Sequence, residues 1–308
     1  MTQVTVRVPA SSANLGSGYD SFGLALSKHN LVAARLAPEG QWEVTVQGEG
    51  VDRARLGHDN LIAVAMARLF SEVGEPHGAV VTSTNTIPFG RGLGSSSAAI
   101  VGGLVAANHL LGSPLAQAAL FRLAVELEGH PDNVAAALFG GFTMCWTDAE
   151  GPMATRVDPP GGLAAVCVVS DARLATRRSR SLLPDEVPHA DAAFDAGRAG
   201  LLAVGIALGR RELLGPGMDD RIHEPYRAAA ITDLFDVRAA LLEAGADGAA
   251  LSGAGPTVVG LVAGVDDADA LSRARGVADR AGELLSGNGG RRSPEAISID
   301  RVGASVAD

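Results

Sequence analysis

The sequence predicts an α+β fold in two domains, and three observations lead to this prediction. At 308 residues, the chain is longer than a single hydrophobic core usually supports. Strand-like segments precede helix-like segments without strict alternation, which argues against a doubly wound parallel sheet. A turn-rich stretch at 148–162 (DAEGPMATRVDPPGG) lies near the middle of the chain. We therefore expect an N-terminal domain over 1–155 and a C-terminal domain over 156–308.

The first half contains strand patterns followed by helix patterns. Residues 3–8 and 42–47 alternate apolar and polar side chains, as half-buried strands do. Residues 60–73 have the apolar spacing of a helix, with Asp59 or Asn60 as its N-cap. The other elements expected in this half are strands at 31–36, 79–84 and 141–147 and helices at 95–110 and 115–128.

The second half has a similar mixture of elements. Residues 287–294 (GNGGRRSP) predict a surface turn because they are rich in glycine and polar residues. The elements expected around it are strands at 164–170, 248–252, 257–263 and 296–302 and helices at 193–212, 233–243 and 266–286.

The composition excludes some classes of protein. A net charge of −10 argues against a general nucleic-acid binder, which needs a basic face. It leaves room for an anionic small ligand bound by backbone N–H groups. No apolar run approaches the roughly 20 residues of a membrane helix, and the first residues lack a secretion signal. We therefore expect a cytoplasmic protein without a membrane partner. Cys145 and Cys167 lack ligand spacing and are expected to be core thiols.

The most informative segment is a glycine-serine loop at 87–100 (IPFGRGLGSSSAAI). Gly90, Gly92 and Gly94 allow positive φ angles and a close approach of the backbone to a ligand. Three serines then open a predicted helix, whose N-terminal N–H groups and dipole favour phosphate. A flexible turn with a serine N-cap is the alternative. The position between a strand and a helix favours phosphate binding. The loop lacks the Gly-Lys-Ser/Thr of a Walker motif and the spacing of a Rossmann fingerprint.

Three motifs in order resemble those of the GHMP kinases, a family of small-molecule kinases. They are PASSANLGSGYD at 9–20, Pro88-x-x-x-Gly-Leu-Gly-Ser-Ser at 88–96 and LSGAGPT at 251–257. The resemblance covers nearly the whole chain. It implies an N-terminal domain like ribosomal protein S5 domain 2, a ferredoxin-like C-terminal domain, and use of ATP and Mg²⁺.

Within that family, four segments are most similar to those of homoserine kinases. One is SANLGSGYD, in which Tyr19 stands where a phenylalanine is typical. The other three are EGHPDNV at 128–134, TRRSRSLLP at 176–184 and DRIHEPYR at 220–227. The resemblance implies a hydroxy amino acid as substrate, with homoserine as the best match.

The predicted substrate residues suit an amino acid on chemical grounds. Arg180 and Arg227 can hold a carboxylate through planar, charge-assisted hydrogen bonds. Asp20 can pair with an ammonium group, and Asn14 and His130 can hydrogen-bond around it. Each arginine alone would more often form a surface ion pair, so this interpretation depends on the motifs around them.

The resemblance also implies residues for the nucleotide and for phosphoryl transfer. Asn60 corresponds to a position near adenine, and Ser96 to a serine that contacts Mg²⁺. Phosphoryl transfer needs positioning and charge neutralisation more than covalent chemistry, and whether a general base operates stays open. The catalytic candidates are Asp132, Asn133, Thr176 and Arg180, and the candidates for the phosphates are Pro88, Gly90, Arg91, Gly92, Leu93, Gly94, Ser95, Ser96 and Ser97.

The metal site departs from the family pattern. Arg122 stands where the family often has a Mg²⁺-binding glutamate, eight residues before His130. On a helix, residues 122, 126 and 130 recur every four residues and share one face, so Glu126 becomes the replacement candidate. Glu128 is a weaker candidate. The alternative is a metal held by ATP, Ser96 and water.

Three functions remain open from the sequence. The first is phosphorylation of homoserine, and the second is phosphorylation of another hydroxy amino acid or amino alcohol. The third is a nucleotide-binding regulator with weak catalysis, which only Arg122 supports. Relatives are commonly homodimers, so we expect a homodimer.

Overall fold

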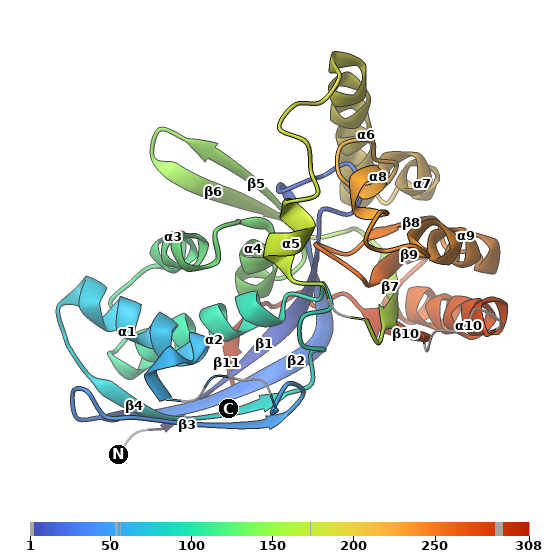
Figure 1. Ribbon diagram of the computed structural model, residues 1–308. Helices are drawn as coiled ribbons and strands as arrows, with labels where there is room; N and C mark the ends of the chain where they lie inside the picture. The colour runs from blue at the N-terminus through green and yellow to red at the C-terminus, as the bar shows by residue number, and fades with distance from the viewer. Residues whose placement is uncertain (1–2, 53–54, 56, 173, 287–291, 308) are drawn as a thin grey trace.

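The chain folds around two β-sheets that stand side by side, each with its own helices (Figure 1). The computed structural model describes residues 3–52, 55, 57–172, 174–286 and 292–307. Strands and helices are mixed in both halves, so the α+β prediction is confirmed.

The first sheet has seven strands and contains the N-terminal half of the chain. Its main path runs β11-β1-β2-β4-β3, and β5 pairs with β2 and β6. Among the described strands of this sheet, β3 and β4 pair in parallel and the other neighbours are antiparallel. The strands are β1 (Gln3–Ala13), β2 (Phe22–Ala37), β3 (Trp42–Gly48), β4 (Gly78–Asn85), β5 (Phe142–Asp148), β6 (Gly151–Val157) and β11 (Ser305–Val306).

The helices between these strands lie together on one side of the first sheet (Figure 1). Helix α1 illustrates why they form. Asn60 caps its N-terminus by accepting from the N–H of Ile62, and Gly74 ends it in the left-handed conformation. The helical elements of this half are η1 (Gly57–Asp59), α1 (Leu61–Val73), α2 (Ser95–Leu110), α3 (Gln117–Glu128) and α4 (Asp132–Phe139).

The second sheet has four antiparallel strands in the order β10-β7-β9-β8. Helices α9 and α10 pack against it, and α6 with α7 and α8 lies above it in Figure 1. The elements are β7 (Gly162–Ser170), α5 (Thr176–Arg180), α6 (His189–Leu208), η2 (Arg211–Leu213), α7 (Leu214–Gly217), α8 (Glu224–Arg227), α9 (Leu234–Ala244), β8 (Gly248–Leu251), β9 (Val258–Gly264), α10 (Asp267–Leu285) and β10 (Arg292–Ser298).

Alternate side chains of β7 enter two different hydrophobic cores. Ala164 and Val166 face the core beneath α9 and α10, while Ala165 and Cys167 join the core that the first sheet also lines. Strand β7 is therefore buried on both faces, and one core crosses between the halves. Cys145 and Cys167 are free and buried, as expected.

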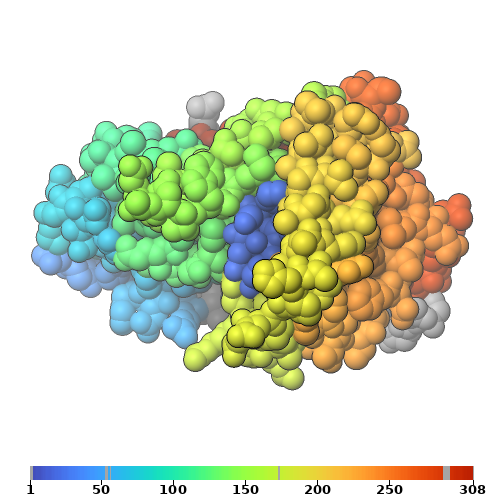
Figure 2. Space-filling view, turned by 90° about the horizontal axis from the view of Figure 1, so that it is seen from above, coloured from blue at the N-terminus to red at the C-terminus, as the bar shows by residue number. Residues whose placement is uncertain are grey.

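The two halves meet along a line where a segment near the N-terminus reaches the surface. Seen from above, this blue segment lies between the green part of the first half and the yellow part that contains α6 (Figure 2). The end of the chain returns to the first sheet, because Val306 of β11 pairs with Val6 of β1.

Some elements differ from the sequence prediction. The stretch 148–162, which was predicted to consist of turns, contains strand β6. None of the residues of β6 is buried, so its strand conformation depends mainly on pairing with β5. Strand β2 begins at Phe22, nine residues before the predicted start, and the short helices α4, α5, α7 and α8 were not predicted. β10 begins at Arg292, inside the predicted turn, and residues 287–291 of that turn lie outside the described residues. The domain boundary after residue 155 stays a prediction.

Candidate active site

The loop between β4 and α2 carries three glycines with left-handed backbones. Gly90, Gly92 and Gly94 have φ angles of 67°, 81° and 70°. A Cβ on Gly92 would lie 2.3 Å from the carbonyl oxygen of Ser252, and one on Gly94 would lie 2.0 Å from Ser11 Oγ. A Cβ on Gly90 would meet no atom within 4 Å. Close packing therefore requires glycine at 92 and 94, whereas Gly90 faces open space.

Segments from both ends of the chain hold this loop in place. The backbone N–H of Ser11 donates to the carbonyl oxygen of Leu93 over 3.2 Å. Ser252 Oγ donates to the carbonyl oxygen of Gly92 over 2.6 Å. The three sequence motifs that were separated along the chain are thus in direct contact around one loop.

Helix α2 begins directly after this loop and presents its N-terminus to a cavity. No side chain caps its first turn, so the first N–H groups and the positive end of the helix dipole are available to an anion. Ser95 and Ser96 line the cavity. Ser97 is fully buried and donates to Glu128 over 2.7 Å, so it supports the site from behind.

Two adjoining cavities lie on either side of the start of α2. The first, of about 170 Å³, is largely polar in its lining side chains. The second, of about 340 Å³, has apolar walls with several amide and hydroxyl groups. They share Leu61, Phe89, Ser95 and Ser96. The second cavity is lined further by Asn30, Val46, Arg55, Asp59, Asn60, Ile62, Ser83, Asn85, Ile87 and Ala99.

Most of the residues predicted to bind nucleotide line these two cavities. Asn60 lines the second cavity while its Oδ1 also caps α1. Pro88, Leu93 and Ser97 line neither cavity, and Leu93 is part of the hydrophobic core. The predicted residues that line the first cavity are Gly90, Arg91, Gly92, Gly94, Ser95 and Ser96.

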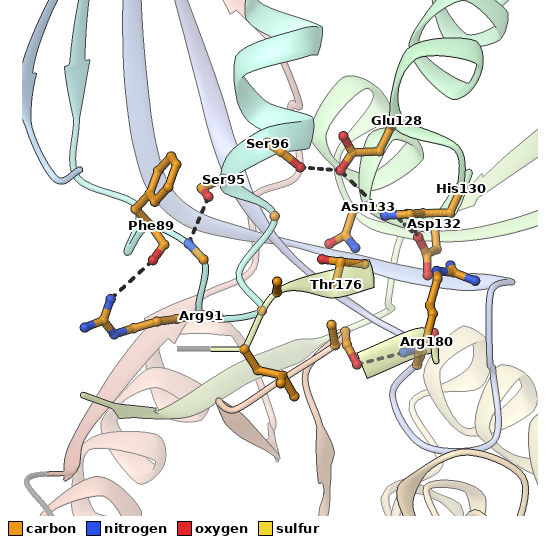
Figure 3. Close-up of a pocket in the computed structure, with 18 of the residues that line it drawn as sticks. Phe89, Arg91, Ser95, Ser96, Glu128, His130, Asp132, Asn133, Thr176 and Arg180 are labelled. Atoms are coloured by element: carbon orange, nitrogen blue, oxygen red, sulfur yellow. Dashed lines mark hydrogen bonds and ion pairs between the residues drawn. The ribbon is translucent and has the colours of Figure 1, made fainter. Parts of the chain in front are cut away.

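A row of polar side chains forms one wall of the first cavity (Figure 3). Ser96 Oγ lies 2.5 Å from Glu128 Oε1, and His130 Nε2 lies 3.6 Å from the same oxygen. His130 Nδ1 lies 2.8 Å from Asp132 Oδ1, which also accepts from the N–H of Asn133. Burial opposes a charge on His130, but the hydrogen bond and charge of Asp132, together with Glu128, raise its pKa above the ordinary value.

The predicted metal role of Glu126 does not fit this geometry. Its carboxylate is exposed, pairs with Arg68 over 3.0 Å and 3.1 Å, and lines neither cavity. The prediction assumed that one helix runs through 122, 126 and 130, but α3 ends at Glu128 with Gly129 in the left-handed conformation. His130 is therefore not on the same helix face. Glu128, the weaker candidate, carries the carboxylate that reaches Ser96.

Arg180 and Asp20 form an ion pair at the edge of the first cavity. Arg180 Nη1 donates to Asp20 Oδ2 over 2.9 Å, and Nη2 donates to Oδ1 over 2.6 Å. Both side chains are 35% exposed. The residues predicted to bind opposite ends of an amino acid thus bind each other in this structure.

Arg227 is a buried cation that lines the same cavity. Its Nη1 donates to the carbonyl oxygen of Gly253 over 2.9 Å and lies 3.1 Å from His223 Nδ1. Among the described residues, no carboxylate lies within ion-pair distance of it, and burial lowers its pKa. A buried guanidinium without a carboxylate partner favours an anionic ligand.

The other predicted residues also reach the first cavity. Asn14 Nδ2 donates to the carbonyl oxygen of Gly253 over 3.0 Å, and Asn133 Oδ1 accepts from Ser11 Oγ over 2.8 Å. Thr176 lines the cavity at the start of α5. The structure therefore brings together every predicted catalytic and substrate residue, although their roles stay predictions.

Several cavity residues were not predicted. Leu61, Phe89 and Leu174 supply apolar walls, and Gly253 and Ala254 supply backbone. The three apolar residues could not be recognised from the sequence, because an apolar residue that lines a ligand cavity and one that lies in the core have the same sequence pattern. Gly253 and Ala254 lie inside the third motif and were findable from it.

Family models match both halves of the chain. The model for the GHMP kinases N terminal domain matches residues 60–141, and the model for GHMP kinases C terminal matches residues 202–280. The chain belongs to the GHMP kinase family. The two-domain fold and the phosphotransferase class implied by the resemblance are confirmed, and membership implies ATP as the phosphoryl donor.

Within the family, similar curated relatives are homoserine kinases. The one from Streptomyces avermitilis is 43% identical over 98% of this chain and 95% of its own length. The one from Carboxydothermus hydrogenoformans is 42% identical over 84% of each chain. A crystal structure of homoserine kinase from Cytophaga hutchinsonii matches with a TM-score of 0.89 and 27% identity, covering 100% of this chain and 98% of that one. A mevalonate diphosphate decarboxylase from Staphylococcus aureus shares the fold, with a TM-score of 0.72 and 17% identity over 99% and 98% of the two chains.

None of the helices in the described part of the chain has the length and apolar character needed to cross a membrane.

Proposed function

We propose that this chain is a homoserine kinase, which transfers the terminal phosphoryl group of ATP to the side-chain hydroxyl of L-homoserine. The observation that carries the proposal is the charge arrangement of the first cavity. A buried Arg227 and an Arg180–Asp20 pair lie in the same cavity as the N-terminus of α2. The first cavity thus contains two arginines that can bind a carboxylate, an aspartate that can bind an ammonium group, and backbone N–H groups that can bind phosphate.

The residues around the two cavities fit ATP. The second cavity offers apolar walls and amide groups to a flat base, and the first offers the open side of Gly90 and the uncapped start of α2 to phosphates. Ser95 and Ser96 line both cavities, so they would lie beside the phosphates. When bound, ATP supplies the phosphoryl group.

The residues of the first cavity also fit Mg²⁺, with Ser96 and Glu128 as its protein partners. Mg²⁺ prefers oxygen ligands and commonly uses one or two from protein, with phosphates and waters completing its shell. Ser96 Oγ and Glu128 Oε1 lie 2.5 Å apart on the cavity wall. The Glu128 side chain is only 9% exposed, its Oε1 lies 3.6 Å from His130 Nε2, and it has no arginine or lysine partner among the described residues, so it suits a cation ligand.

Other residues would orient the reacting groups. Asn133 is held by Ser11, and His130 is held by Asp132, so both side chains have defined directions at the cavity wall. We propose that they, with Thr176, position the hydroxyl and the transferred phosphoryl group. Asp132 Oδ1 already contacts His130 Nδ1 over 2.8 Å and accepts from the N–H of Asn133 over 2.7 Å. A positioning role therefore suits Asp132 better than a role as general base.

The regulator hypothesis loses its only support. Arg122 is exposed on α3 and lines neither cavity, so its presence does not alter the site. The homodimer and the cytoplasmic location inferred from the sequence stay predictions.

A substrate panel tests the proposed function. Purified enzyme with Mg-ATP is assayed on homoserine, serine, threonine, the amino alcohol that lacks homoserine's carboxylate and the hydroxy acid that lacks its ammonium. We expect the highest kcat/KM for homoserine. Each truncated analogue should have a kcat/KM at least about 100-fold lower. Such an analogue carries only one of the two charges, so when it separates Arg180 from Asp20 it leaves one of these two side chains without a partner. Phosphorus NMR of the product identifies the phosphorylated hydroxyl.

The other outcomes separate the alternatives. Equal turnover of homoserine and the amino alcohol would favour a sister kinase that does not read the carboxylate. ATP binding without turnover of any compound would refute the kinase proposal.

A further inference from the structure

Tyr19 contacts both arginines of the first cavity without lining the cavity itself. Its hydroxyl accepts from Arg180 Nη1 over 3.1 Å. The centre of its ring lies 5.5 Å from the guanidinium carbon of Arg227 and 5.9 Å from that of Arg180. It does not appear in the lining of either cavity, so it can influence a ligand there only through its neighbours.

The hydroxyl matters because Arg180 has few other restraints. Its side chain is 35% exposed and extends from α5, a helix of five residues. Among the described residues, its side chain hydrogen-bonds only to Asp20, over 2.9 Å and 2.6 Å, and to Tyr19. If the ammonium of an amino acid takes Asp20, the hydroxyl of Tyr19 is the partner that remains.

The ring matters because Arg227 is buried without a carboxylate. A guanidinium within about 6 Å of an aromatic ring centre is attracted by the ring's negative face. The Tyr19 ring also packs on His223, with centres 5.3 Å apart, and His223 contacts Arg227 over 3.1 Å. Burial lowers the pKa of His223 to about 4, so it is neutral near pH 7 and adds no repulsion.

Tyr19 itself stays neutral in this setting. Burial and the charge of Asp20 raise its pKa, which keeps the proton on the hydroxyl. The hydroxyl can therefore accept from Arg180 without adding a negative charge that would compete with a substrate carboxylate.

We propose that Tyr19 is a positioning residue for the substrate carboxylate, whose hydroxyl holds Arg180 and whose ring holds Arg227 when Asp20 pairs with the substrate ammonium. This inference rests on the proposed function of the same cavity. A phenylalanine, typical of this position in the resembling motif, keeps the ring contacts and lacks the hydroxyl contact, so the hydroxyl is a feature of this chain.

The test is a double-mutant cycle on the full chain. Tyr19→Phe should raise the KM for homoserine about tenfold or more, since it removes one hydrogen bond to a charged group, with kcat and the KM for ATP within about twofold. In an Arg180→Met background the same change should alter the homoserine KM by less than about twofold, because methionine has no donor for the Tyr19 hydroxyl. Tyr19→Leu should raise the KM further than Tyr19→Phe, because the ring contacts are lost too.

The control is Tyr226→Phe, the same chemical change at the chain's only other tyrosine, whose hydroxyl has no hydrogen-bond partner among the described residues. It should leave all constants unchanged. An unaltered homoserine KM in Tyr19→Phe, or an equal effect in both backgrounds, would overturn the inference. A wild-type enzyme that does not phosphorylate homoserine refutes the proposed function instead, and the inference falls with it.

Discussion

Two glutamates near the end of α3 have different surroundings although only one residue separates them. Two steps along a helix turn about 200°, which places side chains on nearly opposite faces. Glu128 faces Ser96 and the first cavity, and Glu126 faces Arg68 at the surface. Only the first is therefore placed to hold a cation beside phosphates.

We expect Glu128→Gln to raise the half-saturating Mg²⁺ concentration by about tenfold or more and to lower kcat, because a metal ligand is lost. Glu126→Gln is the matched control, and its Mg²⁺ titration should coincide with that of the wild type. Activity measured against free Mg²⁺ at saturating ATP gives both values. If the titration shifts for Glu126→Gln and stays in place for Glu128→Gln, the helix-face argument is wrong.

At the scale of elements, the loop before α2 shows how glycines with similar backbones have different functions. Gly90 and Gly94 both have positive φ, of 67° and 70°. A Cβ at 94 would collide with Ser11 Oγ, which holds Asn133, whereas a Cβ at 90 would enter open space beside the cavity. An alanine at either position carries a similar backbone cost, of about 1–2 kcal/mol.

We expect Gly94→Ala to lower Tm by at least about 2 °C more than Gly90→Ala and to lower kcat, because the collision displaces Ser11. Gly90→Val should instead raise the KM for ATP with less loss of kcat, because its side chain enters the space proposed for phosphate. Calorimetry and steady-state kinetics measure these effects. Equal Tm values for the two alanine variants would mean that the loop relaxes around residue 94.

A second element-scale feature is a pair of buried carboxyl groups between α6 and the turn before α8. Asp195 Oδ1 accepts from the N–H of Arg221 over 3.0 Å, and Asp220 lies beside it. Burial first, and then Asp220, raise the pKa of Asp195 from 3.8 to about 7. Between these values the folded state holds a proton that the unfolded state has released, so stability from this group falls as pH rises from about 4 to 7.

We therefore expect Asp195→Asn to stabilise the protein increasingly as the pH rises, by at least about 2 °C in Tm at about pH 8 and little at about pH 4. The amide keeps the acceptor for Arg221 and removes the buried charge. Asp236→Asn, the same change at an exposed carboxyl on α9, is the control and should show no such trend. A constant difference between wild type and Asp195→Asn across this range would contradict the raised pKa.

At the scale of the whole molecule, one hydrophobic core contains residues from both halves of the chain. Val8 and Leu24 of the first sheet share one cluster with Cys167 and Leu261 of the second. Ile299, near the end of the chain, belongs to the same cluster. The active site likewise takes residues from both halves, so neither half contains it alone.

We expect a single cooperative unfolding transition for the whole chain. Homoserine with a non-hydrolysable ATP analogue should move that transition as a unit, by about 2.7 kcal/mol at 100 times the Kd. Scanning calorimetry with and without ligands measures this. Two resolved transitions, only one of them shifted by ligand, would show that the halves unfold independently.

The sequence predicted elements best where a local pattern was strong. The helix at 95–110 was predicted with the bounds that α2 has, since glycine and serine mark its start. β6 was missed because its side chains are only partly buried and its strand conformation depends on pairing with β5. The short helices α5 and α8 were missed because four or five residues carry no helical periodicity, although both hold a predicted arginine.

By itself, the sequence determined the family, the two-domain α+β class and the set of motif residues that meet in the first cavity. These depend on residue identity and order, which motifs record directly. The tertiary structure decided that Glu128 rather than Glu126 faces Ser96, that Arg180 pairs with Asp20, and that Tyr19 contacts both arginines. The physical reason is that a side chain's direction depends on where its helix ends and on partners more than 100 residues away. The spacing of neighbouring residues in the sequence predicts neither of these.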